Sequence, residues 1–226
     1  MTENDEGLSE LNTHDLMDAS QPDSPFRTLR RFVRPRANAE RCEMCSLEVA
    51  GTHAHLVEPL KRQILCVCDA CALLFSGSAG SKYRRVPRDG RVLQGFVLTD
   101  AQWDALLIPI QLAFFYFSTP ENKIVALYPS PAGPTESLLD LGAWDEIVQD
   151  NPVLGELEAD VEALLVNRVR GARDYYIAPI DECYKLVGLI RANWRGFSGG
   201  HEVWQAIEGF FSALNKRSSG GGSSIA

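Results

Sequence analysis

The cysteines are the residues best placed to do chemistry, because five of the six fall within thirty residues. Four of them form two Cys-x-x-Cys pairs, called the first and second knuckle below. These pairs are Cys42 with Cys45 and Cys68 with Cys71, and 22 residues separate them. A Cys-x-x-Cys turn directs two sulfurs at one centre and frees backbone N–H groups to hydrogen-bond them. Two such turns supply the four thiolates of a tetrahedral zinc site. We therefore expect these four cysteines to bind one metal ion, with zinc as the first candidate.

Other donors in the same segment leave the ligand set open. Cys66 lies two residues before Cys68, and on a strand the two side chains would share one face. Cys66, His53 and His55 are therefore alternative ligands in place of a knuckle sulfur. The simpler interpretation is that Cys66 packs beneath the cysteine-rich module that contains both knuckles, and that both histidines lie at the surface. Thiolates also suit iron or an iron–sulfur cluster, which is the alternative to zinc.

The expected role of the metal is structural rather than catalytic. A catalytic zinc keeps an open position beside a carboxylate base, whereas four thiolates close the coordination shell. No His-Glu-x-x-His or His-x-Glu pattern is present. Residues 196–200 match Gly-x-Ser-x-Gly, but a predicted helix precedes them and only His201 follows, so we interpret them as a turn. The sequence thus predicts a protein that is not an enzyme.

Several elements are predicted around and after the cysteines. Strands over 55–60 and 63–67 form a hairpin between the knuckles, and residues 76–91, rich in Gly, Ser and Arg, form a linker or mobile loop. Thr99 and Gln102 have capping-box spacing and open a short helix that ends at Leu107. The scaffold of the metal site is therefore expected to be a short hairpin flanked by turns.

The C-terminal half predicts a sheet covered by helices. A hairpin over 110–117 and 123–128 is followed by a Pro-rich loop (PSPAGP), a helix over 156–169 whose β-branched end is either helix or strand, and a short strand at 175–177. Apolar residues recur at helical spacing over 180–194, including Cys183 as a core thiol, and again over 203–214. These two stripes predict an αα-hairpin packed on the sheet.

The predicted fold class is α+β: an N-terminal zinc-ribbon-like module followed by a mixed α+β domain that ends in an αα-hairpin. The predicted divisions are a disordered acidic tail (1–25), a basic arm (26–39), the module and linker (40–91), the α+β domain (92–216) and a flexible tail (217–226).

Charge is distributed unevenly along the 226 residues. Residues 1–25 carry seven acids and no Lys or Arg, 26–91 carry thirteen Lys or Arg against six acids, and 92–226 carry nine against seventeen. The basic middle favours an acidic partner surface, and the arginines predicted to bind it are Arg30, Arg31, Arg34, Arg84 and Arg85. The arm is either a docking or phosphate-binding segment or a solvated lead-in. A nucleic-acid-binding zinc ribbon is a further alternative, disfavoured by the sequence pI of about 5.1.

The chain is also expected to be cytoplasmic, with no membrane insertion. The longest apolar run, 106–117, is interrupted by Pro109 and Gln111 and is too short to cross a bilayer. The N-terminus is acidic, unlike a signal or transit peptide. Clustered cysteines without signs of secretion favour a metal site over disulfides.

The sequence resembles a known bacterial family over about residues 27–215. The resemblance rests on the strings RCEMC, HAHLVEPLKRQILCVCDACALLF, YPSPAGPTESLL, NPVL, DVEALLVNR and IDECYKLVGLIRANWRGFSGGHEVW. The genes of that family lie in clusters for high-affinity, oxygen-tolerant NiFe uptake hydrogenases. The resemblance implies an accessory or maturation role with a hydrogenase subunit or maturation factor as partner. It assigns no catalytic residue, and among functional positions only the two cysteine pairs carry over, as metal ligands.

Overall fold

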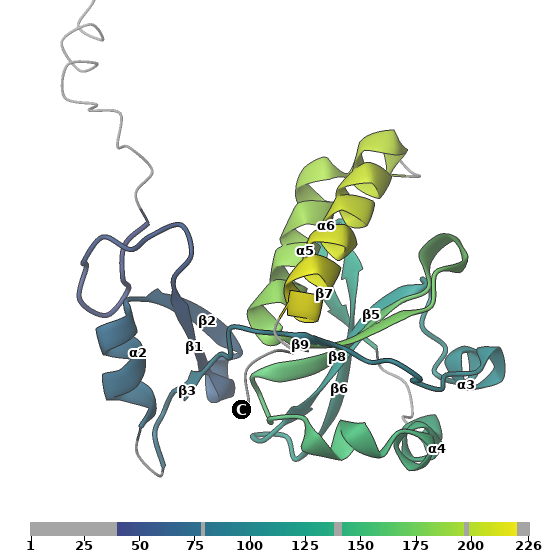
Figure 1. The fold of residues 1–226 in the computed structure, drawn as a ribbon, viewed down its shortest axis with the longest axis horizontal. Helices are drawn as coiled ribbons and strands as arrows, with labels where there is room; N and C mark the ends of the chain where they lie inside the picture. Colours follow the sequence, from purple (N-terminus) through teal and green to yellow (C-terminus); the bar gives the residue numbers. More distant parts are fainter. Residues whose placement is uncertain (1–39, 78–79, 138–141, 197–198, 221–226) are drawn as a thin grey trace, which may run out of the picture. The chain divides into compact units, whose positions relative to one another are not determined.

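A computed structural model of the chain describes residues 40–77, 80–137, 142–196 and 199–220. The predicted acidic tail and basic arm, with Arg30, Arg31 and Arg34, lie outside these ranges, as do residues 221–226. The described residues combine helices and antiparallel strands, so the predicted α+β class is confirmed (Figure 1). No helix among the described residues is long and apolar enough to span a membrane.

The first part of the described chain contains a three-stranded antiparallel sheet with strand order β2-β1-β3. Its elements are β1 (Ala54–Glu58), a 3-10 helix (Pro59–Lys61), β2 (Gln63–Val67), α2 (Asp69–Ser76) and β3 (Arg84–Arg85). The β1–β2 hairpin was predicted. β3 was not, since it falls within the segment expected to be a linker or mobile loop. A strand of two residues is too short to produce an alternating pattern in the sequence.

The larger part of the chain is built on a six-stranded antiparallel sheet with strand order β4-β9-β8-β5-β6-β7. Its strands are β4 (Arg91–Val92), β5 (Leu112–Ser118), β6 (Lys123–Ser130), β7 (Gly133–Glu136), β8 (Glu162–Asn167) and β9 (Asp174–Pro179). The helices are α3 (Asp100–Ala105), α4 (Gly142–Asp150), α5 (Ile180–Asn193) and α6 (Gly200–Gly220), with 3-10 helices at Pro152–Glu156 and Val169–Gly171.

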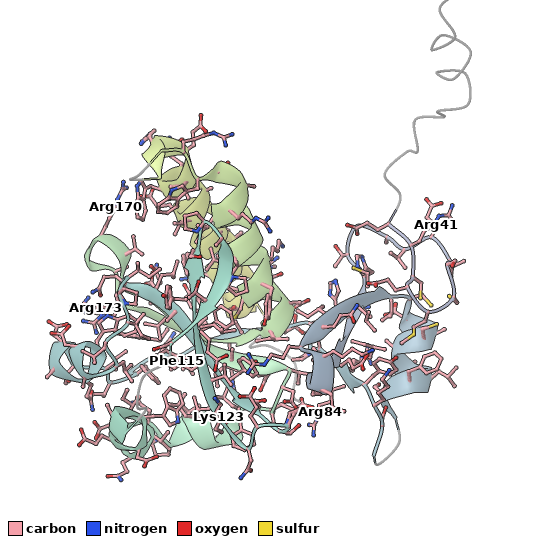
Figure 2. The ribbon with its side chains drawn as sticks, turned by 180° about the vertical axis from the view of Figure 1, so that it is seen from behind. Arg41, Arg84, Phe115, Lys123, Arg170 and Arg173 are labelled. Atoms are coloured by element: carbon pink, nitrogen blue, oxygen red, sulfur yellow. The ribbon has the colours of Figure 1, made fainter. Side chains whose placement is uncertain are left out.

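Both faces of this sheet are buried. Along β5, Phe114 and Tyr116 enter the core beneath α5 and α6, whereas Ala113 and Phe115 enter the core beneath α3 and α4. Phe115 stacks on Trp144 of α4 with ring centroids 5.1 Å apart, and Figure 2 shows it deep among the side chains of the sheet. Figure 1 shows α5 and α6 side by side, as the predicted αα-hairpin requires.

Double-sided burial explains why one segment was only partly predicted. The segment 156–169 was expected to be a helix whose β-branched end is either helix or strand. It contains no α-helix, and that end is β8, in which Ala163 and Leu165 face one core and Leu164 and Val166 face the other. A strand that is apolar on both faces shows no alternation, so its leucines and valines fell by chance at helical spacing.

The Pro-rich loop was also predicted incorrectly. PSPAGP forms the turn and the first pairs of the β6–β7 hairpin, with Pro129 opposite Pro134. β7 is an edge strand and pairs with β6 alone. The missing N–H of Pro134 in β7 can therefore face away from the sheet without removing a hydrogen bond between strands.

The helices α3, α5 and α6 were predicted, whereas α2 and α4 were not. Thr99 caps α3, and Thr99 and Gln102 form the predicted capping box. The apolar face of α5 is buried, and Cys183 within it is fully buried, as expected of a core thiol. Burial raises the pKa of this thiol well above its ordinary value, so it is held in the neutral form.

Candidate metal centre

The first cysteine knuckle is a tight turn held by backbone hydrogen bonds. Cys42 N–H donates to the Leu47 carbonyl at 2.7 Å, and Ser46 N–H donates to the Cys42 carbonyl at 2.8 Å. Ser46 adopts a left-handed conformation with φ of 62°, which closes the turn. Arg41 and Glu48 form an antiparallel bridge across its base. The turn therefore presents Cys42 and Cys45 on the same side.

The second knuckle is the start of a helix. β2 ends at Val67, and Cys68 is the N-cap of α2. The Cys68 sulfur accepts the N–H of Cys71 at 3.5 Å. A helix N-terminus carries unpaired N–H groups and a partial positive charge, both of which favour thiolates.

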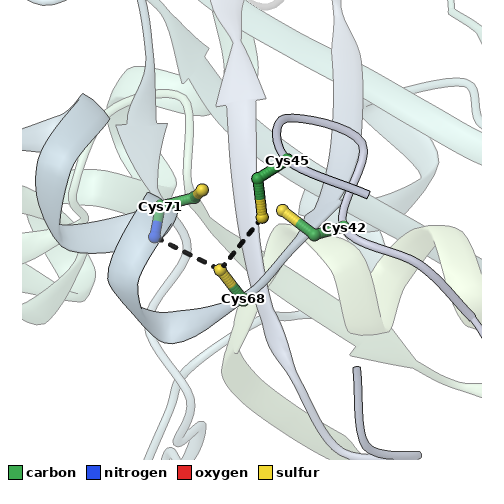
Figure 3. Close-up of side chains that lie close together, drawn as sticks. All are labelled: Cys42, Cys45, Cys68 and Cys71. Atoms are coloured by element: carbon green, nitrogen blue, oxygen red, sulfur yellow. Dashed lines mark hydrogen bonds between the residues drawn. The ribbon is translucent and has the colours of Figure 1, made fainter. Parts of the chain in front are cut away.

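The two knuckles bring four sulfurs to one point. One ligand atom from each of Cys42, Cys45, Cys68 and Cys71 lies within 4.8 Å of all the others. The Cys45 and Cys68 sulfurs are 3.8 Å apart, and Figure 3 shows the four side chains converging. Four sulfurs at about 2.3 Å from a tetrahedral zinc would lie roughly 3.8 Å from one another. The group has the spacing and the donor chemistry to hold one metal ion.

Two of these thiols have strongly shifted pKa values. Burial opposes ionisation of Cys42, but N–H groups of Cys68, Cys45 and Met44 outweigh it and lower the pKa of Cys42 to about 6. Burial and the neighbouring thiols raise the pKa of Cys71 to about 12. The N–H groups around Cys42 thus favour its thiolate, whereas burial and the neighbouring thiols favour the protonated form of Cys71.

The alternative ligands Cys66, His53 and His55 do not belong to this group and instead lie close to one another. Cys66 was predicted to share a face with Cys68, but the strand ends between them, so the alternation does not continue. The histidines were expected at the surface, yet the His53 side chain is only 8% exposed.

Two of the arginines predicted to bind a partner lie among the described residues. Arg84 pairs with the buried carboxylate of Asp160 at 3.1 Å, so its charge is used within the chain. The side chain of Arg85 is half-buried and has no ion pair among the described residues.

Sequence reasoning missed two carboxylates that position the module. Glu43, inside the first knuckle, accepts the N–H of Cys66 at 2.7 Å and so ties that knuckle to β2. Asp181, at the start of α5, lies 2.8 Å from His55. Neither contact has a signal in local spacing, because each joins residues far apart in the chain.

Comparison with known proteins gives one match. No curated protein and no solved structure matches this chain. The model of a family of unknown function, DUF5947, matches residues 41–218, a range that includes both knuckles and the six-stranded sheet. The chain therefore belongs to the family of unknown function DUF5947.

Proposed function

We propose that this protein is a non-enzymatic, zinc-binding accessory protein that binds a partner protein during assembly or maturation of a NiFe hydrogenase. The observation that carries the proposal is the group of four sulfurs within 4.8 Å. Four thiolates fill the coordination shell of zinc and leave no position for a substrate, which suits a structural role. The proposed location is the cytoplasm, where thiols stay reduced.

Exposed apolar side chains next to the metal group support partner binding. Leu73 and Leu74 of α2 are 62% and 75% exposed, and Leu47 of the first knuckle is 60% exposed. Large apolar side chains gathered at a surface are typical of protein interaction sites. The resemblance to a family encoded with NiFe uptake hydrogenases supplies the class of partner, a hydrogenase subunit or a maturation factor.

The metal is tested by elemental analysis and an absorption spectrum of protein purified anaerobically without chelator. We expect at least one zinc per chain and no visible band. Cys68→Ser should remove that zinc, while Cys183→Ala, which changes a thiol outside the group, should retain it. Iron with visible charge-transfer bands would overturn the zinc assignment and favour the alternative of a redox or iron–sulfur handling protein.

The partner is tested by affinity purification of the tagged chain from cells that express the hydrogenase gene cluster. We expect a hydrogenase subunit or maturation factor to co-purify, and the double variant Leu73→Ser/Leu74→Ser to reduce its recovery at least tenfold. Leu107→Ser is the matched control, since Leu107 is 66% exposed but follows α3. Recovery of no hydrogenase component, or equal loss in the control, would contradict the proposal.

A further inference from the structure

A second group of metal donors lies on the β1–β2 hairpin, apart from the four cysteines. One ring nitrogen of His53, one of His55 and the sulfur of Cys66 all lie within 4.8 Å of one another. His55 and Cys66 are direct partners across the hairpin, and His53 precedes His55 by two residues. Residues opposite each other in a hairpin point to the same face, so the register brings His55 and Cys66 together, and His53 joins them from the residue just before β1.

Hydrogen bonds fix which nitrogen of each histidine is free. His55 Nδ1 lies 2.8 Å from a carboxylate oxygen of Asp181, and His53 Nδ1 lies 2.9 Å from the carbonyl oxygen of Ala50. A carbonyl and a carboxylate accept hydrogen bonds, so each Nδ1 carries the proton and donates it. Each neutral ring then keeps its lone pair on Nε2. Histidines that bind metals typically donate the other N–H to a carboxylate or carbonyl in this way.

One of these nitrogens is buried without a partner. His53 Nε2 is inaccessible to solvent and makes no hydrogen bond among the described residues, and the side chain is 8% exposed. A second carboxylate, that of Glu40, lies 3.4 Å from His53 Nδ1 and so supports the same tautomer. A buried polar atom without a partner is destabilising, and a cation beside Nε2 would satisfy it.

His53, His55 and Cys66 are among the residues that line a cavity of about 630 Å³. Its lining also includes Asp181 and Glu182 from the start of α5 and Arg217 of α6. This volume falls in the range of small-molecule sites. A metal ion held by three protein ligands here would have a path of entry and a fourth position open toward the cavity.

We infer that His53, His55 and Cys66 bind a divalent metal ion of the zinc class through two Nε2 atoms and one sulfur, with the fourth position open to water or a small ligand. Two imidazoles and a thiolate suit zinc and its neighbours in the first transition row. The inference goes beyond the proposed function and does not depend on it, because the two groups share no ligand. One closed and one open site would then lie in the same small module.

The test is an anaerobic titration of the metal-free, reduced full-length protein with cobalt(II), followed by its absorption spectrum. We expect two equivalents per chain, with strong thiolate-to-cobalt charge transfer from the four-cysteine site and weaker charge transfer from the second site. The double variant His53→Gln/His55→Gln should bind one equivalent fewer. Glutamine can still donate to Asp181 and Ala50 but offers no nitrogen lone pair. His201→Gln, at an exposed position on α6, is the matched control and should bind both equivalents.

Three further measurements keep the outcome unambiguous. Azide should change the ligand-field bands of the second cobalt and leave those of the four-thiolate cobalt unchanged, because only the second has an open position. Cys68→Ser should remove the first equivalent and leave the second, so loss of either site is distinguishable. Cadmium NMR of the wild-type chain requires no variant and should give two resonances of different donor sets. A single resonance, or one equivalent of cobalt that the double histidine variant does not reduce, would overturn the inference.

Discussion

The cysteine module and the six-stranded sheet are stabilised in different ways. The module has a small core of its own, made of Cys42, Ala54, Leu56, Leu65, Val67, Cys71 and Ala72. Two of these seven residues are cysteines of the metal group. The sheet instead buries aromatic and aliphatic side chains on both faces. Apolar cores as small as that of the module rarely stabilise a fold without a metal or a disulfide. We therefore expect metal binding by the cysteines to provide stability that apolar burial does not.

The module also depends on contacts with the rest of the chain. Val57 of β1 and Val86, just after β3, belong to the core that contains α5 and α6 rather than to the core of the module. Arg62, in the β1–β2 turn, pairs with Glu136 of β7 at 2.9 Å and also with Glu121. The comparison therefore predicts that one face of the hairpin is held by metal and the other by the sheet domain.

Removal of the metal should have the largest effect, and it should be confined to the module. Structural zinc contributes about 10–16 kcal/mol to folding in zinc-finger peptides. We expect Cys68→Ser, or chelation under reducing conditions, to abolish hydrogen-exchange protection in the first knuckle and at the start of α2. Amides of β5 and β8 should keep their protection, since both cores of the sheet remain intact. Hydrogen exchange followed by mass spectrometry measures both regions in one sample.

Cys183→Ala is the matched control for that measurement, because it removes a buried thiol from α5 and none from the module. It should lower global stability without selective loss of protection around the knuckles. Equal loss of protection in β5 and the first knuckle after chelation would mean that the two regions unfold as one unit. The conclusion that metal stabilises the module alone, and apolar burial the sheet, would then be wrong.

Local features of the module were predictable from the sequence. The spacing of Cys42, Cys45, Cys68 and Cys71 identified the metal group, because each pair is positioned by a turn of a few residues. The hairpin between them and the helical face of α5 followed from short-range periodicity. These features depend on neighbours in the chain, where propensity and pattern carry the information.

Features that depend on distant contacts were not predictable. The position of Cys66 depends on β2 ending at Val67, one residue before the knuckle, and its pairing with His55 depends on the hairpin register. The residues of β8 were left between helix and strand, because two helical layers bury the strand from both sides and remove its alternating pattern. The contact of His55 with Asp181 requires the packing of α5 beside the module, which no local pattern encodes.

A smaller effect is expected where the module meets the sheet through Arg84. The Asp160 side chain is 3% exposed, and it accepts hydrogen bonds from the backbone N–H and the hydroxyl of Thr119 at 2.8 and 2.7 Å. Arg84→Ala would leave this buried carboxylate without its cation. Because the Arg84 side chain is 41% exposed, water replaces part of the interaction. We expect a loss of about 1–2 kcal/mol in the free energy of unfolding, measured by urea denaturation.

Arg85→Ala is the matched control, since it removes the same charge from the neighbouring residue, which has no ion pair among the described residues. Its effect should stay within about 0.5 kcal/mol. If both variants lost the same stability, the contribution would come from net charge rather than from the contact with Asp160. Arg84 would then remain available to a partner, as the sequence first indicated.

The smallest effect should come from Glu136, and it should depend on pH. Hydrogen bonding to Arg62 lowers the pKa of Glu136 below its ordinary value of 4.5, against burial, which raises it. An acid whose pKa is lowered in the folded state stabilises that state fully above its unfolded pKa. The stabilisation disappears as the pH falls through the folded pKa. Glu136→Gln should therefore cost up to about 1 kcal/mol at pH 7 and almost nothing in strong acid.

The measurement is urea denaturation of the wild type and Glu136→Gln from pH 7 down to pH 3. Glu146→Gln is the matched control, because Glu146 is an exposed acid on α4 with no ion pair among the described residues. If the difference in free energy of unfolding between wild type and Glu136→Gln stayed constant from pH 7 to pH 3, Arg62 would not act through the charge of Glu136. The hairpin would then be held to the sheet by Val57 and its apolar neighbours, and the electrostatic part of the comparison would fail while the metal part stood.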